Sequence, residues 1–320
     1  MHSGFSRYML RRAALAVLLV LVVSSAALLL ARLAPGDHLG FDVDPAIAAA
    51  ERHRLGRDRP LLVQYGAWLG RVARLDLGES LRYGRPVADL IGERAGNTAL
   101  LGISALIVAT ALGIPAGILT GSRRGGLLTA TARGLSILLL SVPPLITSLA
   151  LLLVASRTGW FPVGGFVAPP PDAGVIDAIA MTLRQLVLPV LALALPVAAA
   201  LERLQSRSIG EALSEPCILA ARARGLPIRR VVWRHALRLS LKPVLAIYGI
   251  VIGSLLSGSF AVEIVMTWPG LGRLMYDALT ARDTELVAGC AAAGSAFLAA
   301  GILMSDLALA VVDPRVEEAA

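Results

Sequence analysis

The stretch 211–243 reads EALSEPCILAARARGLPIRRVVWRHALRLSLKP and lies between two long apolar runs. Within it, residues 220–225 form the segment AARARG, in which alanine and arginine favour helix and glycine commonly follows a helix end. Pro227 cannot continue a helix. The pattern predicts a short helix that stops at Gly225, then a second helical stretch, Arg229 to Leu241, that ends before Pro243. Such a basic island is either a docking element for a partner or a solvated loop.

The composition is typical of a membrane protein. Of the 320 residues, 56% are hydrophobic and 16% are charged, whereas about a quarter of the residues in soluble proteins are charged. The net charge of +8 is explained by basic loops retained on the cytoplasmic side and by anionic lipid headgroups, so no nucleic-acid partner is predicted. Only Cys217 and Cys290 are cysteines, one in the basic island and one in an apolar run, and a disulfide framework is not expected.

Uncharged runs long enough to cross about 30 Å of hydrocarbon predict six transmembrane helices. In chain order these are Ala13–Ala31, Asn97–Ser122, Gly134–Ser156, Gln185–Leu201, Pro243–Val262 and Leu286–Ser305. The expected fold is therefore all-α and polytopic. We divide it into a cytoplasmic N-terminus with the first span (1–34), an extracytoplasmic segment (35–96) and a five-helix transmembrane core (97–320) that contains the cytoplasmic loop 202–242.

Two sequence features qualify these spans. Glycines recur four residues apart in the second and fifth, which lets helix backbones approach closely, and we favour packing within the chain as the reason. They are Gly113, Gly117, Gly121, Gly249 and Gly253. Prolines, among them Pro143 and Pro144, are expected to kink or interrupt spans.

The orientation follows from basic residues near the span ends. With a cytoplasmic N-terminus, short inner loops carry 16 arginines and lysines and short outer loops carry four. The long segment after the first span is left out because the rule loses force for long loops. Both termini and the island 211–243 are therefore predicted to be cytoplasmic.

Most enzymatic chemistry is excluded by missing residue patterns. No GxSxG motif is present, and the four histidines, His2, His38, His53 and His235, fall in loops without the spacing of metal ligands. We predict no catalytic site, metal or cofactor. The only lysine, Lys242, is followed by proline, so the chain cannot form a Walker-type nucleotide site of its own.

A proton- or ion-coupled secondary transporter is the alternative function. Carriers keep ionisable groups inside the membrane, and Asp306 is the candidate here. It lies near the cytoplasmic end of the last span, where pairing with an arginine is the other explanation.

A series of motifs in order along the chain resembles the permease subunits of bacterial ABC importers of the dipeptide, oligopeptide and nickel family, in particular the first of the two permeases. The motifs are Arg32–Asp37, Leu55–Leu61, Asp76–Ser80, Gly84–Val87, Ser141–Pro144, Ala221–Leu226, Arg234–Arg238, Pro243, Glu263, Trp268–Gly272 and Asp313–Arg315. The resemblance implies a type I importer permease fold and transport of peptides, with nickel or other small solutes as alternatives.

The resemblance also implies partners and a coupling site. These are a second homologous permease, two cytoplasmic ATPase subunits that hydrolyse ATP, and an extracytoplasmic solute-binding protein. The coupling helix seats on an ATPase subunit, with Ala221 and Gly225 expected at the contact and the arginines pairing with carboxylates. Its residues are Ala220, Ala221, Arg222, Ala223, Arg224, Gly225 and Leu226. Leu219 stands where many such permeases have glutamate.

A turn after the fifth span is the second candidate site. Glu263, Trp268, Gly270 and Gly272 are assigned by position and resemblance to an outer gate or to the seat of the binding protein. If the glycines matter for their backbone angles, β-branched residues there should impair transport. The simpler alternative makes Trp268 an anchor in the lipid headgroups.

Overall fold

The computed structural model describes residues 2–34, 53, 58–122, 125–163, 165–168, 170 and 172–312, and this part of the chain is nearly all helical. The elements in chain order are α1 (His2–Leu33), α3 (Leu61–Val72), α4 (Val87–Ser122), α5 (Leu127–Ser141), α6 (Pro144–Thr158), α7 (Val175–Ala212), α8 (Pro216–Ala223), α9 (Ile228–Arg230), the π-helix η1 (Val231–Ala236), α10 (Leu237–Ala246), α11 (Tyr248–Val265), α12 (Leu271–Thr280) and α13 (Thr284–Val312). The predicted all-α class is confirmed.

Within the described residues, five helices are long and apolar enough to cross a membrane: α1, α4, α7, α11 and α13. The predicted third span, Gly134–Ser156, is not one straight helix, because α5 and α6 meet at 109°. Val142 and Pro143 are both extended at the break, since a residue before proline is disfavoured in the helical region. The expectation that prolines interrupt a span is confirmed here, and counting the bent pair as one span gives six.

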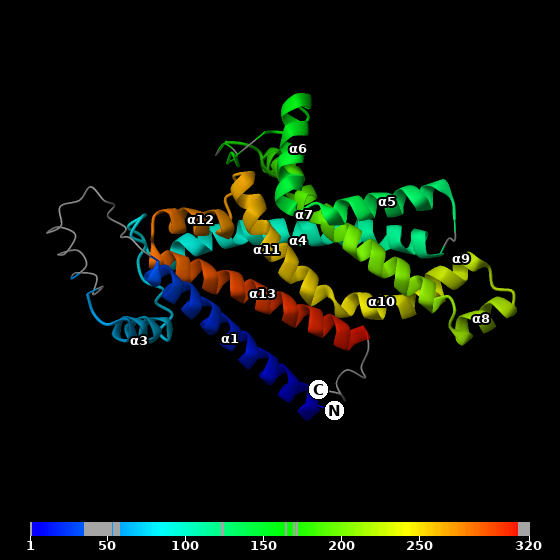
Figure 1. The fold of residues 1–320 in the computed structure, drawn as a ribbon, viewed down its shortest axis with the longest axis horizontal. Helices are drawn as coiled ribbons and strands as arrows, with labels where there is room; N and C mark the ends of the chain where they lie inside the picture. Colours follow the sequence, from blue (N-terminus) through cyan, green and yellow to red (C-terminus); the bar gives the residue numbers. More distant parts are fainter. Residues whose placement is uncertain are drawn as a thin grey trace.

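The helix α4 packs along α7, and α1 packs along α13 (Figure 1). The glycine spacing in α4 explains the first contact: a Cβ on Gly117 would lie 2.6 Å from the Cβ of Gln205 on α7. Gly113 and Gly121 face α7 in the same way, and Gly249 and Gly253 of α11 face α13. The interpretation of these glycines as packing sites within the chain is confirmed.

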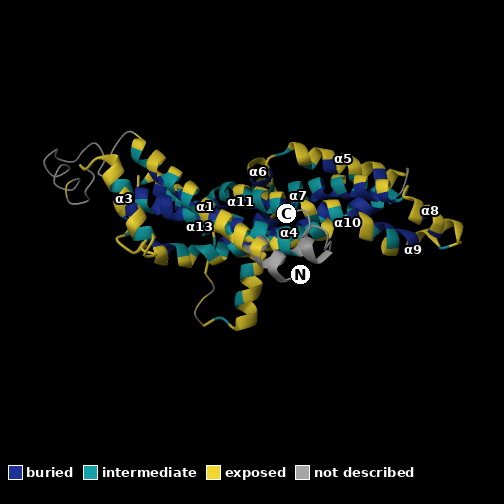
Figure 2. Ribbon diagram, turned by 90° about the horizontal axis from the view of Figure 1, so that it is seen from below, coloured by how far each residue is buried: buried dark blue, intermediate teal, exposed yellow. Residues whose placement is uncertain are grey.

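The main core fills the space between α4, α7 and α11 with buried side chains that include Leu101, Leu193, Leu201, Val262 and Trp268. Most of the surface of α5 is exposed (Figure 2), and that surface is largely apolar, as in Leu135, Ile137 and Leu138. Such exposed apolar side chains on α5 are suited to contact with hydrocarbon or with another membrane helix.

The described part of the segment 35–96 is ordered around α3. Along α3, Leu62 is 84% exposed, whereas Trp68 is buried against Leu28 of α1 and Ala288 of α13. Tyr65 stacks on Trp68 with 5.9 Å between ring centroids. The segment therefore packs against two spans, α1 and α13, and not against the first span alone.

Ion pairs fasten the same segment. Glu285, at the start of α13, accepts from Arg32 of α1 and from Arg71 of α3, each at 3.0 Å. Through Glu285, these ion pairs join α1 and α3 to the start of α13.

The region predicted as loop 202–242 is mostly helical. The helix α7 runs on to Ala212, and α9, η1 and α10 follow one another without a break. The predicted end of this stretch before Pro243 is wrong, because the helix passes through Pro243 and breaks only at Ile247, whose N–H bonds to the carbonyl of Val244 at 3.2 Å. The fifth span accordingly begins at Tyr248.

Candidate functional site

The short helix of the basic island is α8, which begins at Pro216 and ends at Ala223. Gly225 follows with φ +82°, a left-handed conformation that favours glycine. Its N–H bonds to the carbonyl of Arg222 at 2.9 Å, and the N–H of Leu226 bonds to that of Ala221 at 3.4 Å. These bonds satisfy carbonyls that would otherwise be left open at the helix end. The predicted abrupt stop at Gly225 is confirmed.

The two faces of α8 differ. Ala220, Arg222, Ala223, Arg224 and Gly225 are exposed, as is Leu219 on the same helix. Ala221 is only 7% exposed and lies on the buried face with Ile218. Ala221 therefore lies on the face of α8 that packs against the rest of the chain. Unlike its neighbours, it does not line the outer face, where a partner would dock.

A compact apolar cluster holds α8 to the rest of the molecule. Ile218 of α8 packs with Ile209 and Ala212 of α7, with Val231 of η1, and with Ile118 of α4. Leu226 packs against the same cluster. Because close-packed side chains transmit displacement, a force on the exposed face of α8 acts on the ends of α4 and α7.

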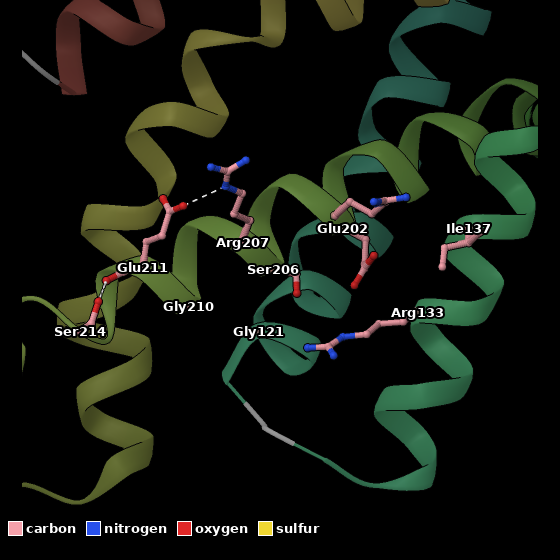
Figure 3. A pocket seen from close by; sticks show the side chains of 10 residues that line it. Gly121, Arg133, Ile137, Glu202, Ser206, Arg207, Gly210, Glu211 and Ser214 are labelled. Carbon is pink, nitrogen blue, oxygen red and sulfur yellow. Dashed lines mark hydrogen bonds and ion pairs between the residues drawn. The ribbon is translucent and has the colours of Figure 1, made fainter.

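A cavity of about 600 Å³ opens beside α7 at the same end of the molecule (Figure 3). Glu202 is buried in its wall and accepts a hydrogen bond from the Thr120 hydroxyl, while Arg133 of α5 donates to the Thr120 carbonyl at 2.7 Å. These groups link α4, α5 and α7. Sequence reasoning missed them because Glu202 stands one residue beyond an apolar run and resembles the start of a loop.

The second candidate site is built around Glu263, which is fully buried near the end of α11. Its carboxyl accepts from the Thr98 hydroxyl at 2.7 Å, from the N–H of Gly272 at 2.6 Å and from the N–H of Arg273 at 3.4 Å. The last two are open N–H groups in the first turn of α12, where a carboxyl group is well placed. Thr98 in turn accepts from the N–H of Leu271 at 2.8 Å.

Trp268 is 2% exposed, so the interpretation of this residue as a headgroup anchor is wrong. Its indole N–H donates to the carbonyl of Asn97 at 3.1 Å, and its ring meets Phe166 edge-on with 5.3 Å between centroids. The Asn97 amide donates to the carbonyl of Pro269 at 2.8 Å. The turn 268–273 is thereby tied to α4 on one side and to α11 on the other.

The glycines of this turn are required by close approach rather than by backbone angle. Gly270 is extended at φ −107°, a conformation open to any residue, but a Cβ there would collide with the Glu263 carboxyl. A Cβ on Gly272 would lie 2.5 Å from the Cα of Phe260. The residue with a positive φ is Thr267, directly before the turn. The expectation that these two glycines are needed for their backbone angles is therefore wrong, and they are needed because other atoms lie too close for a side chain.

Asp306, on which the secondary-transporter alternative depended, is paired. Its carboxylate lies 3.1 Å from the guanidinium of Arg12 on α1. This ion pair between α1 and α13 agrees with the other explanation of Asp306, that it pairs with an arginine near the cytoplasmic end of the last span.

The comparisons with known proteins agree with this geometry. Residues 113–318 match the family described as binding-protein-dependent transport system inner membrane component. The chain is 34% identical to the oligopeptide transport system permease protein AppB of Bacillus subtilis over 316 residues, which is 97% of this chain and 99% of AppB. It is 35% identical to a putative peptide permease protein of Brucella suis, with the same coverage. With OppB of Mycobacterium tuberculosis the identity is 33% over 85% of each chain.

The family match includes α8 and the 268–273 turn, and the two long alignments extend to nearly the whole chain. The nearly all-helical fold, with five candidate spans or six if the bent pair counts as one, fits this family. The chain therefore belongs to the family of binding-protein-dependent transport system inner membrane components, integral inner-membrane permease subunits with the type I ABC importer fold.

Proposed function

We propose that this permease carries peptides and that separate ATPase subunits drive it through α8. The names of its relatives, which are oligopeptide and peptide permeases aligned over most of the chain, support peptides as the cargo. Nickel and other small solutes are the alternative cargoes. The observation that carries the coupling role is the exposed basic face of α8 on a buried apolar seat.

The outer face of α8 suits a groove on an ATPase subunit. Alanines at positions 220 and 223 allow a close approach, and Arg222 and Arg224 offer two guanidinium groups to carboxylates. Gly225 ends the helix without a side chain in the way, since nothing lies within 4 Å of its Cβ position. With two permeases in the transporter, each would dock one ATPase subunit.

A second permease is needed to enclose a path. Side chains fill the space between α4, α7 and α11, so one chain does not form a pore through its own centre. The path then lies along a face that this chain shares with a homologous partner. A solute-binding protein, which the family description presupposes, would deliver the cargo at the opposite end from α8.

We infer that the α8 end is cytoplasmic, together with both termini. The charge difference between short loops, 16 against four, is the support for this orientation. In Figure 1, α8 and α9 lie at one end of the molecule and α3 and α12 at the other. This arrangement puts the turn 268–273 on the external side, where Glu263, Trp268 and the two glycines would form part of the outer gate.

The mechanism is then alternating access. ATP binding draws the ATPase subunits together, and α8 moves with the subunit on which it is seated. The apolar cluster passes this movement to the ends of α4 and α7, which are locked together by the glycine contacts. At the other end, the bonds from Glu263 and Trp268 join α4, α11 and α12 into one unit that opens or closes the external side.

The test is uptake by vesicles that contain this chain with its sister permease, the ATPase subunits and the binding protein. Defined di-, tri- and pentapeptides should compete with one another for ATP-dependent uptake, and nickel should not. Collapse of the proton gradient should leave uptake unchanged. Uptake that needs the gradient but not ATP would contradict the ATP-driven function, and competition by nickel alone would contradict peptides as the cargo.

A further inference from the structure

A groove on the surface next to α8 has no role in the function proposed above. We call it the Arg–Trp groove: a hollow of about 600 Å³ lined by Pro227, Arg229, Arg230, Trp233 and Arg234. The three arginines are exposed, and Trp233 is 53% exposed in spite of its large apolar ring. Three guanidinium groups around an exposed indole form a concave surface with positive charge and an apolar wall.

The π-helix η1 contributes Trp233 and Arg234 to this grouping, and α9, directly before it, contributes Arg229 and Arg230. In a π-helix the backbone bonds join residues five apart, in place of four in an α-helix. Trp233 and Arg234 are exposed on η1. On the opposite side, Val231, Val232 and Ala236 are buried. Since π-turns are rare and often occur at functional sites, their presence under this groove supports a binding role.

The described part of the chain does not neutralise the charge of the groove. No aspartate or glutamate occurs between Glu215 and Glu263, whereas this interval holds six arginines and a lysine. Within the described residues, Arg229, Arg230 and Arg234 form no ion pair and no side-chain hydrogen bond. Guanidinium groups bind phosphate oxygens through paired hydrogen bonds, so the ligand chemistry that fits is a phosphate group.

The position of the groove relative to the membrane indicates which molecule supplies the phosphate. The buried side of η1, Val231 and Val232, packs against Ile118 of α4. Ile118 lies four residues before Ser122, where the apolar run of that membrane span ends. Because the groove lies beside the end of this apolar run, we expect it at the height of the lipid headgroups. Tryptophan and arginine with long apolar stems are the residues that settle at this level.

We propose that the Arg–Trp groove binds the headgroup phosphate of an anionic phospholipid, with Trp233 against the upper part of the acyl chains. The exposed Ile228, 55% accessible, extends the same apolar wall. A lipid would then hold the α9–η1 helix on the membrane surface beside α8. The alternative occupant, an acidic surface of an ATPase subunit, would account for the arginines but not for an exposed indole at headgroup level.

The test uses the full chain in nanodiscs and measures quenching of tryptophan fluorescence by lipids brominated near the headgroup. Brominated phosphatidylglycerol should quench more than an equal mole fraction of brominated phosphatidylcholine. The difference should vanish in Trp233→Phe, which identifies the fluorophore. Replacing Arg229, Arg230 and Arg234 by glutamine should lower the preference for the anionic lipid on the order of fivefold per arginine. Inorganic phosphate in solution should not relieve the quenching.

A matched variant separates the groove from general charge attraction. Arg222, Arg224 and Arg238 are also exposed and lie outside the groove, so their replacement by glutamine removes the same charge. This control should keep the lipid preference. Equal quenching by both lipids, or equal loss in both triple variants, would overturn the proposal. So would a groove variant that keeps its lipid preference but no longer binds the ATPase, because the groove would then be a protein contact.

Discussion

The backbone N–H of Gly272 donates to the carboxyl of Glu263 at 2.6 Å, which ties the first turn of α12 to the end of α11. The carboxyl is fully buried, and the Thr98 hydroxyl of α4 donates to its other oxygen. One side chain thus joins three helices at the end of the molecule opposite α8. The adjoining glycines exist to leave room for this contact.

Alanine at Gly270 or Gly272 should already impair transport. The added methyl collides with Glu263 in one case and with the Phe260 backbone in the other, and overpacking of this kind costs about 1–3 kcal/mol. Uptake and thermal stability of the inserted protein are the measurements. Gly102→Ala is the control, because nothing lies within 4 Å of its Cβ position. Full activity in both variants would show that the turn tolerates displacement and has no gating role.

Glu263→Gln should weaken the same junction while keeping its volume. An amide has one oxygen for three donors, and its NH2 group would face a hydroxyl or an open backbone N–H. Leaving a buried donor without a partner costs about 1–3 kcal/mol. We expect a lower melting temperature and slower uptake, and Asp177→Asn, a change at an exposed carboxylate of α7, serves as a control. A melting temperature equal to that of the wild type would contradict the role of this carboxyl as a junction.

Gly117→Ala tests the contact between α4 and α7. The new Cβ would lie 2.6 Å from the Cβ of Gln205 and 2.7 Å from the Glu202 carbonyl, so the helices must separate or tilt. Gly102, a glycine of α4 with open space at its Cβ position, again provides the comparison. We expect transport to fall although α8 is untouched, because the path from α8 to the membrane core runs through this contact. Normal transport in an inserted Gly117→Ala variant would rule out a rigid α4–α7 unit.

Cys217 is a natural probe of orientation. It is exposed on α8, whereas Cys290 is buried in α13. An impermeant thiol reagent should leave Cys217 unlabelled in intact cells and label it in inside-out vesicles. Val167→Cys, introduced with Cys217→Ser, should show the reverse, since Val167 is exposed near the 268–273 turn. Labelling of Cys217 from outside intact cells would reverse the topology.

The sequence was sufficient for features that depend on local chemistry. The helix stop at Gly225, the break at Pro143 and the packing glycines of α4 all follow from backbone sterics that act within a few residues. The ion pair of Asp306 with Arg12 could be anticipated as a type of contact, because a charge in a membrane span needs a partner.

Features that depend on which surfaces meet could not be predicted. The buried face of α3 is set by α1 and α13, parts of which lie far from it in the sequence, and no local pattern identifies Trp68 as the buried residue. The burial of Trp268 depends on Asn97 and Phe166 in the same way. Proline 243 was expected to end a helix, but its neighbours keep the helix intact until Ile247. The burial of Ala221 likewise depends on the packing of α8 against η1 and α7, which the local sequence does not show.

The central claim is that the exposed face of α8 docks an ATPase subunit, and co-purification of that subunit with single variants tests it most directly. Gly225 has φ +82°, which both asparagine and aspartate tolerate better than most residues, so Gly225→Asn and Gly225→Asp differ mainly in charge. The account predicts that Gly225→Asp, facing partner carboxylates, loses tenfold or more in ATPase binding and stops uptake, while Gly225→Asn retains most of both. Arg222→Glu should lose binding more strongly at low than at high salt. If Gly225→Asp binds the ATPase and transports as the wild type does, α8 is a solvated loop and the account is wrong.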